Sequence, residues 1–189
     1  MAAQTSKFTD ACVRDRLLDA ADELFYQHGV QAVGIDRVLA EAGAAKASLY
    51  AHFGSKDELV AAYVERRTRE AREKIVAYVD AAPPDARALR LFDFVVEWVE
   101  SPDFHGCPMQ HIVGELHDDA HPARALVLAQ RSWLAERLAE WVRDAGASDV
   151  PQVAGALMVL FDGAVAGSEL DGSRRAHDAR WMAKRLLTR

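Results

Sequence analysis

The chain has 189 residues, of which 50% are hydrophobic and 28% are charged, and its formal net charge is −6. This length suits one or two packed domains and excludes a single minimal module, while the low glycine and proline content argues against long disordered tracts. The acidic balance argues mildly against nucleic-acid binding, because dedicated nucleic-acid binders usually show a basic footprint.

Cysteine content and hydropathy indicate the compartment. Two cysteines, Cys12 and Cys107, make no disulfide framework, and the polar first ten residues predict no secretory signal. The longest strongly apolar run, residues 153–161, is too short to cross a bilayer. We therefore expect a cytoplasmic protein that has no membrane partner.

Helical periodicity dominates the first quarter of the chain. Apolar residues recur at helical spacing in residues 10–28, and a short helix is predicted over residues 35–42. Gly43 supplies the positive φ that a tight turn between helices needs, and a third short helix is predicted over residues 45–52. Ser55 and Glu58 have the spacing of a capping box, which predicts that a long helix begins there.

The remainder is also predicted to be helical. No run alternates between apolar and polar residues as a strand would, so the expected fold class is all-α with about nine helices. Residues 151–168 are apolar on nearly every side, which predicts burial. The other predicted helices of this part are residues 85–100, 108–117, 123–145 and 173–187.

The two short helices joined by a glycine turn have the pattern of a helix-turn-helix unit, in which the second helix enters the major groove. Small side chains on residues 45–52 would let the backbone approach DNA, while Leu49 and Phe53 would pack inward. We expect Lys46 to contact phosphate or guanine, and Ser48 to contact bases. The predicted DNA-binding residues are Lys46, Ala47, Ser48, Tyr50, His52 and Lys56.

The run "IDRVLAEAGAAKASLYAHFGSKDELVAAYVE" resembles the TetR-type family of bacterial transcriptional repressors over about residues 14–65. The later "GCPMQHIVGELHDDAHPAR" resembles the start of the C-terminal core in many members. The resemblance implies a homodimer of nine-helix chains that uses the six residues named above on DNA. The chain departs from the pattern at Gly34 and Ala45, where members commonly have Ser or Thr, and both losses weaken the expected hold on phosphate.

On this interpretation residues 1–55 form the helix-turn-helix DNA-binding domain and residues 56–189 form the effector-binding and dimerisation domain. Half-sites on DNA lie about 34–36 Å apart or a multiple of that, which requires a dimer. Small residues and apolar residues of the last two helices suit a four-helix bundle with a second copy. The predicted dimer contacts are Gly155, Leu157, Leu160, Phe161, Gly163, Met182 and Leu186.

The resemblance also implies that a small-molecule effector binds in the larger domain and releases the repressor from its operator. The candidate pocket residues are Trp98, Phe104, Met109, Ile112, Trp133 and Phe161. Large apolar residues at helical spacing are also what ordinary core packing needs, so both interpretations stay open. No cofactor and no catalytic residue is expected.

Two other functions remain open. Four histidines, together with Cys107 and Glu115, gather between residues 105 and 121, as a helical metal-dependent enzyme or sensor would need. The histidines are His105, His111, His117 and His121. No HExxH motif is present, and Pro122 disfavours helical geometry at His121. A helical interaction protein without a DNA role is the other alternative.

Overall fold

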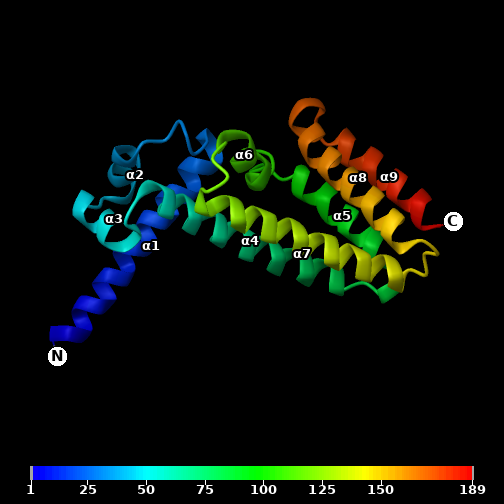
Figure 1. Cartoon of the computed structure of the whole chain (residues 1–189), viewed down its shortest axis with the longest axis horizontal. Helices are drawn as coiled ribbons and strands as arrows, with labels where there is room; N and C mark the ends of the chain where they lie inside the picture. The colour runs from blue at the N-terminus through cyan, green and yellow to red at the C-terminus, as the bar shows by residue number, and fades with distance from the viewer. Residues whose placement is uncertain (1, 189) are drawn as a thin grey trace. The chain divides into compact units, whose positions relative to one another are not determined.

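The computed structural model describes the backbone of residues 2–188 and the side chains of residues 12–188. Within this range it contains helices and no strand, which confirms the predicted all-α class (Figure 1). The helices are α1 (Ala2–His28), α2 (Ile35–Ala42), α3 (Lys46–Phe53), α4 (Lys56–Asp80), a 3-10 turn η1 (Pro84–Ala86), α5 (Arg87–Val99), α6 (Pro108–Glu115), α7 (Pro122–Asp144), α8 (Val150–Asp171) and α9 (Arg174–Leu187).

Local chemistry explains several helix ends. Gly43 ends α2 in the left-handed conformation, with φ 58° and ψ 42°, as its position in the sequence predicted. The backbone N–H of Glu58 donates to Ser55 Oγ at 3.1 Å, which is one half of the predicted capping box. Asp149 caps α8 by accepting from the backbone N–H of Gln152 at 3.1 Å.

The chain divides into two compact units. The first consists of the residues up to Arg67 together with His111–Val127, and the second consists of Thr68–Gln110 and Leu128–Arg189. The division falls inside α4, α6 and α7. The domain boundary between residues 55 and 56 that we expected from the sequence stays a prediction.

In the first unit α1, α2 and α3 pack on one another. The rings of Phe25 and Tyr63 meet edge to face at 5.6 Å between centroids, which ties α1 to α4. The apolar side chains that form this core include Leu17, Ala21, Phe25, Val38, Leu49 and Val64.

In the second unit α8 packs against α9 and α5, as the orange, red and green ribbons in Figure 1 show. One face of α8 enters the core through Leu157, Phe161 and Val165. The opposite face is exposed in the single chain, although the uniformly apolar sequence predicted burial on every side. By length and composition alone α8 could cross a bilayer, but core helices of soluble proteins meet the same criterion.

Candidate nucleic-acid interface

Three residues connect α2 to α3. After the left-handed Gly43, the backbone N–H of Ala44 donates to Leu39 O at 3.1 Å, and Ala45 is extended with φ −80° and ψ 150°. Leu49 is completely buried and Phe53 is 7% exposed. The turn therefore sets the angle between the helices, and these two side chains hold α3 on the core of the first unit.

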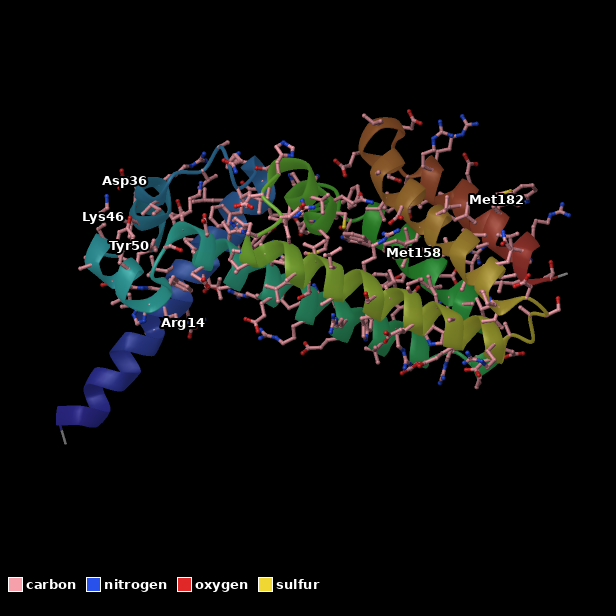
Figure 2. The ribbon with its side chains drawn as sticks, in the orientation of Figure 1. Arg14, Asp36, Lys46, Tyr50, Met158 and Met182 are labelled. Atoms are coloured by element: carbon pink, nitrogen blue, oxygen red, sulfur yellow. The ribbon has the colours of Figure 1, made fainter. Side chains whose placement is uncertain are left out.

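The outward face of α3 has mostly small side chains. Ala47 and Ala51 are exposed, and Ser48 is half-buried. The larger side chains of Lys46 and Tyr50 lie on the same outer edge as Asp36 of α2 (Figure 2). A helix with such a face can approach base edges in the major groove, because its outward alanines leave room for the backbone and its two larger side chains lie at the edge.

The three remaining candidates for DNA contact are less exposed, and they are Ser48, His52 and Lys56. His52 is half-buried, and its ring lies edge to face with Phe53 at 6.4 Å between centroids. Lys56 is half-buried in the first turn of α4. The structure thus places Lys46, Ala47 and Tyr50 on the surface and leaves the other candidates partly covered.

The N-termini of α2 and α3 directly follow the two positions where the sequence departs from the family pattern. Neither Gly34, which precedes α2, nor Ala45, which precedes α3, offers a side-chain hydrogen bond to its helix. A helix N-terminus attracts phosphate through its backbone N–H groups and its dipole even without a capping hydroxyl. Backbone phosphate contacts therefore remain available at Ile35 and Asp36.

Ion pairs join α4 to α1 within the first unit. Arg66 Nη1 donates to Asp19 Oδ1 at 2.5 Å, and Arg67 Nε donates to Asp22 Oδ1 at 2.7 Å. The Arg67 guanidinium also lies 4.4 Å from the ring centroid of Tyr26. Both arginines thus hold α4 against α1. Arginine suits this role because its planar guanidinium can bind a carboxylate with two N–H groups and can stack on an aromatic ring.

The candidate effector residues fall into both units. Trp98, Phe104 and Trp133 are half-buried against the core of the second unit, where Phe161 is 9% exposed. Met109 is half-buried in the same unit, whereas Ile112 is 1% exposed and belongs to the first unit. Their role in effector binding stays a prediction.

The candidate dimer residues also differ from one another. Gly155, Gly163 and Met182 are exposed, and Leu160 and Leu186 are half-buried. Leu157 and Phe161, in contrast, are buried in the core of the single chain.

Sequence reasoning missed three strongly exposed apolar residues on α8 and α9. Val159 is 70% exposed, Leu170 is 87% exposed and Trp181 is 57% exposed. On α8, Val159 and Leu170 continue the spacing of three to four residues that begins at Gly155 and passes through Gly163. That spacing was the signal that could have identified the two residues of α8.

The structure does not support the metal-site alternative. Glu115 accepts a hydrogen bond from the backbone N–H of Gln31 at 2.8 Å, and His121 Nδ1 accepts one from the backbone N–H of Ala123 at 3.1 Å. Among residues 12–188, no three His, Cys, Asp or Glu side chains come together as a metal ion would need.

Comparisons with known proteins agree with this geometry. Residues 17–63 match the model of a family described as bacterial regulatory proteins, tetR family. Among solved structures, SCO4454, a TetR-family transcriptional regulator from Streptomyces coelicolor, is 33% identical with a TM-score of 0.89. That match covers 94% of this chain and 95% of SCO4454.

Two relatives extend the comparison. LmrA, an HTH-type transcriptional regulator of Bacillus subtilis, is 29% identical over 140 residues, which are 72% of this chain and 74% of LmrA. Rv1255c, an HTH-type transcriptional regulator of Mycobacterium tuberculosis, is 41% identical over 76 residues. This second match covers 40% of this chain and only 38% of the length of Rv1255c.

Proposed function

Because the chain belongs to the TetR family of transcriptional regulators, we propose that it is a repressor that binds a DNA operator as a homodimer and leaves it when a small-molecule effector binds. The exposed face of α3 is the observation that supports this most directly. Its outward alanines are flanked by Lys46 and Tyr50, and its inward Leu49 and Phe53 fix its angle. The proposal includes no catalytic activity and no cofactor.

In the proposed complex α3 lies in the major groove. Lys46 contacts a phosphate or a guanine edge, Ala47 contacts a thymine methyl group, and Ser48 donates to or accepts from a base. Tyr50, His52 and Lys56 contact phosphates on either side of the groove. Specificity then comes from three small or flexible side chains, and most of the affinity comes from the phosphate contacts.

The homodimer is proposed to form through the exposed face of α8 and α9. Gly155 and Gly163 let a second helix approach closely, and Val159, Leu170 and Trp181 supply apolar area that is exposed in the single chain. Exposed apolar patches of this kind commonly mark protein–protein interfaces. A dimer presents two copies of α3 to adjacent half-sites, which one chain cannot do.

Release by effector is proposed as a population shift. An effector that binds more tightly to the conformation with low operator affinity shifts the dimer toward that conformation. The free energy of DNA binding then becomes less favourable by the coupling free energy between the effector site and the DNA site. Trp98, Phe104, Met109, Trp133 and Phe161 of the second unit are the proposed contacts. We place the protein in the cytoplasm, where the DNA lies.

The test begins with DNA selected from random sequence by the wild-type protein. Operator affinity is then measured across a salt series for the wild type, for Lys46→Ala and for Lys74→Ala, a matched loss of one exposed lysine on α4. Lys46→Ala should weaken operator binding by about 1–3 kcal/mol, and Lys74→Ala should change it little. Absence of a sequence-specific component in the wild type would refute the proposed function, and equal effects of the two substitutions would refute the contact.

A further inference from the structure

Glu115, the last residue of α6, reaches a turn 84 positions earlier in the chain. Its Oε2 accepts a hydrogen bond from the backbone N–H of Gln31 at 2.8 Å, and both residues belong to the first unit. Gln31 lies in the turn between α1 and α2, three residues before Gly34. The contact therefore joins α6 to the segment through which the chain enters the helix-turn-helix unit.

The Glu115 carboxylate also lies close to Gly29, at the start of this turn. Gly29 has φ +84°, a conformation that favours glycine. A Cβ atom placed on Gly29 would lie 2.7 Å and 2.9 Å from the two carboxylate oxygens of Glu115. The backbone conformation is what favours glycine here, and the short distances show that the Glu115 carboxylate lies directly against Gly29.

The end of α6 is itself held firmly in the first unit. On either side of Glu115, Ile112 is 1% exposed and Leu116 is 6% exposed. Arg124 Nη1 donates to the carbonyl oxygen of Leu116 at 2.7 Å. Glu115 therefore extends from a packed segment and can impose a position on the turn it contacts.

We propose that Glu115 is a positioning residue for operator binding. Gly34 gives α2 no side-chain cap, so only backbone hydrogen bonds to the carbonyl oxygen of Gly34 hold the start of that helix locally. The Glu115 carboxylate supplies the constraint from a distance, since it holds the backbone of Gln31 and keeps α2 and α3 in one orientation toward DNA. This inference rests on the proposed function, because it concerns the fit of α3 to an operator.

The experiment uses the full-length protein and the operator selected by the wild type. Glu115→Ala removes the acceptor, Glu115→Gln keeps an acceptor oxygen at the same reach, and Glu115→Asp shortens the side chain by one methylene. Glu136→Ala, at an exposed position of α7, controls for the loss of one negative charge. Affinity is measured at fixed salt for the operator and for unrelated DNA of equal length, with hydrogen exchange of α2 and α3 as the readout of local folding.

We expect Glu115→Ala and Glu115→Asp to weaken operator binding about tenfold, while Glu115→Gln stays within about twofold of the wild type. Affinity for unrelated DNA should change little in all variants, because non-specific binding depends on phosphate charge rather than on the fit of α3. Protection of the α2 and α3 amides should be retained.

Three results separate the possible failures. No operator preference in the wild type would refute the proposed function itself. A wild type that selects an operator, with Glu115→Ala binding equally well, would overturn only this inference. Parallel losses of operator affinity, non-specific affinity and amide protection would show that Glu115 merely stabilises the fold, which would also overturn it.

Discussion

Lys46 Nζ lies 3.9 Å from Asp36 Oδ1, so the first lysine of α3 faces a carboxylate from the first turn of α2 (Figure 2). The two side chains are 64% and 90% exposed, and such exposed pairs stabilise a protein by about 0–1 kcal/mol at most. The importance of Asp36 therefore lies in its position beside the proposed DNA contacts, where its charge opposes phosphate.

We expect Asp36→Asn to bind both operator and unrelated DNA more tightly, by about two- to fivefold at low salt, with the gain shrinking as salt rises. Fluorescence anisotropy over a salt series measures the effect. Glu73→Gln on α4 removes one exposed charge elsewhere and should leave affinity nearly unchanged. Weaker operator binding by Asp36→Asn would instead show that Asp36 contacts a base or holds Lys46 in place.

Gly34 is a site where one added hydroxyl should improve both folding and binding. Its φ of −80° suits any residue, and a Cβ atom there would meet no other atom within 4 Å. Gly34→Ser should stabilise the protein by about 0.5–1 kcal/mol, because the hydroxyl caps α2 and the unfolded chain loses entropy. Urea denaturation measures this gain.

Gly34→Ala is the matched control, because it makes the same backbone change without a hydroxyl. We expect it to be less stable than Gly34→Ser by about 0.5–1 kcal/mol. Operator affinity should also rise more for Ser than for Ala, since the hydroxyl can donate to a phosphate. If the two variants bind the operator equally well, the side chain of residue 34 does not contact a phosphate.

The exposed apolar residues of α8 provide a test of the proposed dimer. Val159→Glu and Leu170→Glu each place a charge on the face that would be covered, so both should shift the protein toward monomer and weaken operator binding by at least about tenfold. Leu128→Glu is the control, because Leu128 is 63% exposed but lies on α7. Analytical ultracentrifugation over a concentration series measures the oligomer. If the α8 variants still form dimers at the same concentrations, the dimer interface lies on another surface.

The sequence predicted what local rules determine. The periodicity, the left-handed Gly43 and the Ser55 cap each arise from residues a few positions apart, so the helices and the helix-turn-helix turn could be predicted. On α8 the small residues Gly155 and Gly163 marked part of the exposed face, but a helix that is apolar on nearly every side has no polar face to show which of its large apolar residues point outward. Hence Leu157 was predicted at the dimer contact although it is buried in the core, and Val159 was missed.

The contact between Glu115 and Gln31 could not be predicted from the sequence, for a different reason. The two residues are 84 positions apart, and neither residue type indicates a partner at that separation. Glu115 was instead grouped with nearby histidines as a possible metal ligand. Short spacing in sequence suggested that set, but the fold uses Glu115 and His121 in separate hydrogen bonds to backbone N–H groups.

The two cysteines should differ strongly in reactivity. Burial raises the pKa of the Cys107 thiol, and hydrogen bonds from the backbone of Gln110 and Met109 offset this only in part. Less thiolate is then present at pH 8, and the thiolate is the reactive form. Cys12 is exposed on α1.

We therefore expect iodoacetamide to modify Cys12 at least about tenfold faster than Cys107 in the native protein, and the two should react alike in urea. Mass spectrometry of the time course, repeated with Cys12→Ser, assigns each rate. Operator binding by Cys12→Ser should also survive mild oxidation, since a protonated and covered thiol is a poor target for oxidants. Fast labelling of Cys107 would mean that the segment before α6 opens readily. Loss of operator binding on oxidation would then identify Cys107 as a redox-responsive residue, contrary to what its burial predicts.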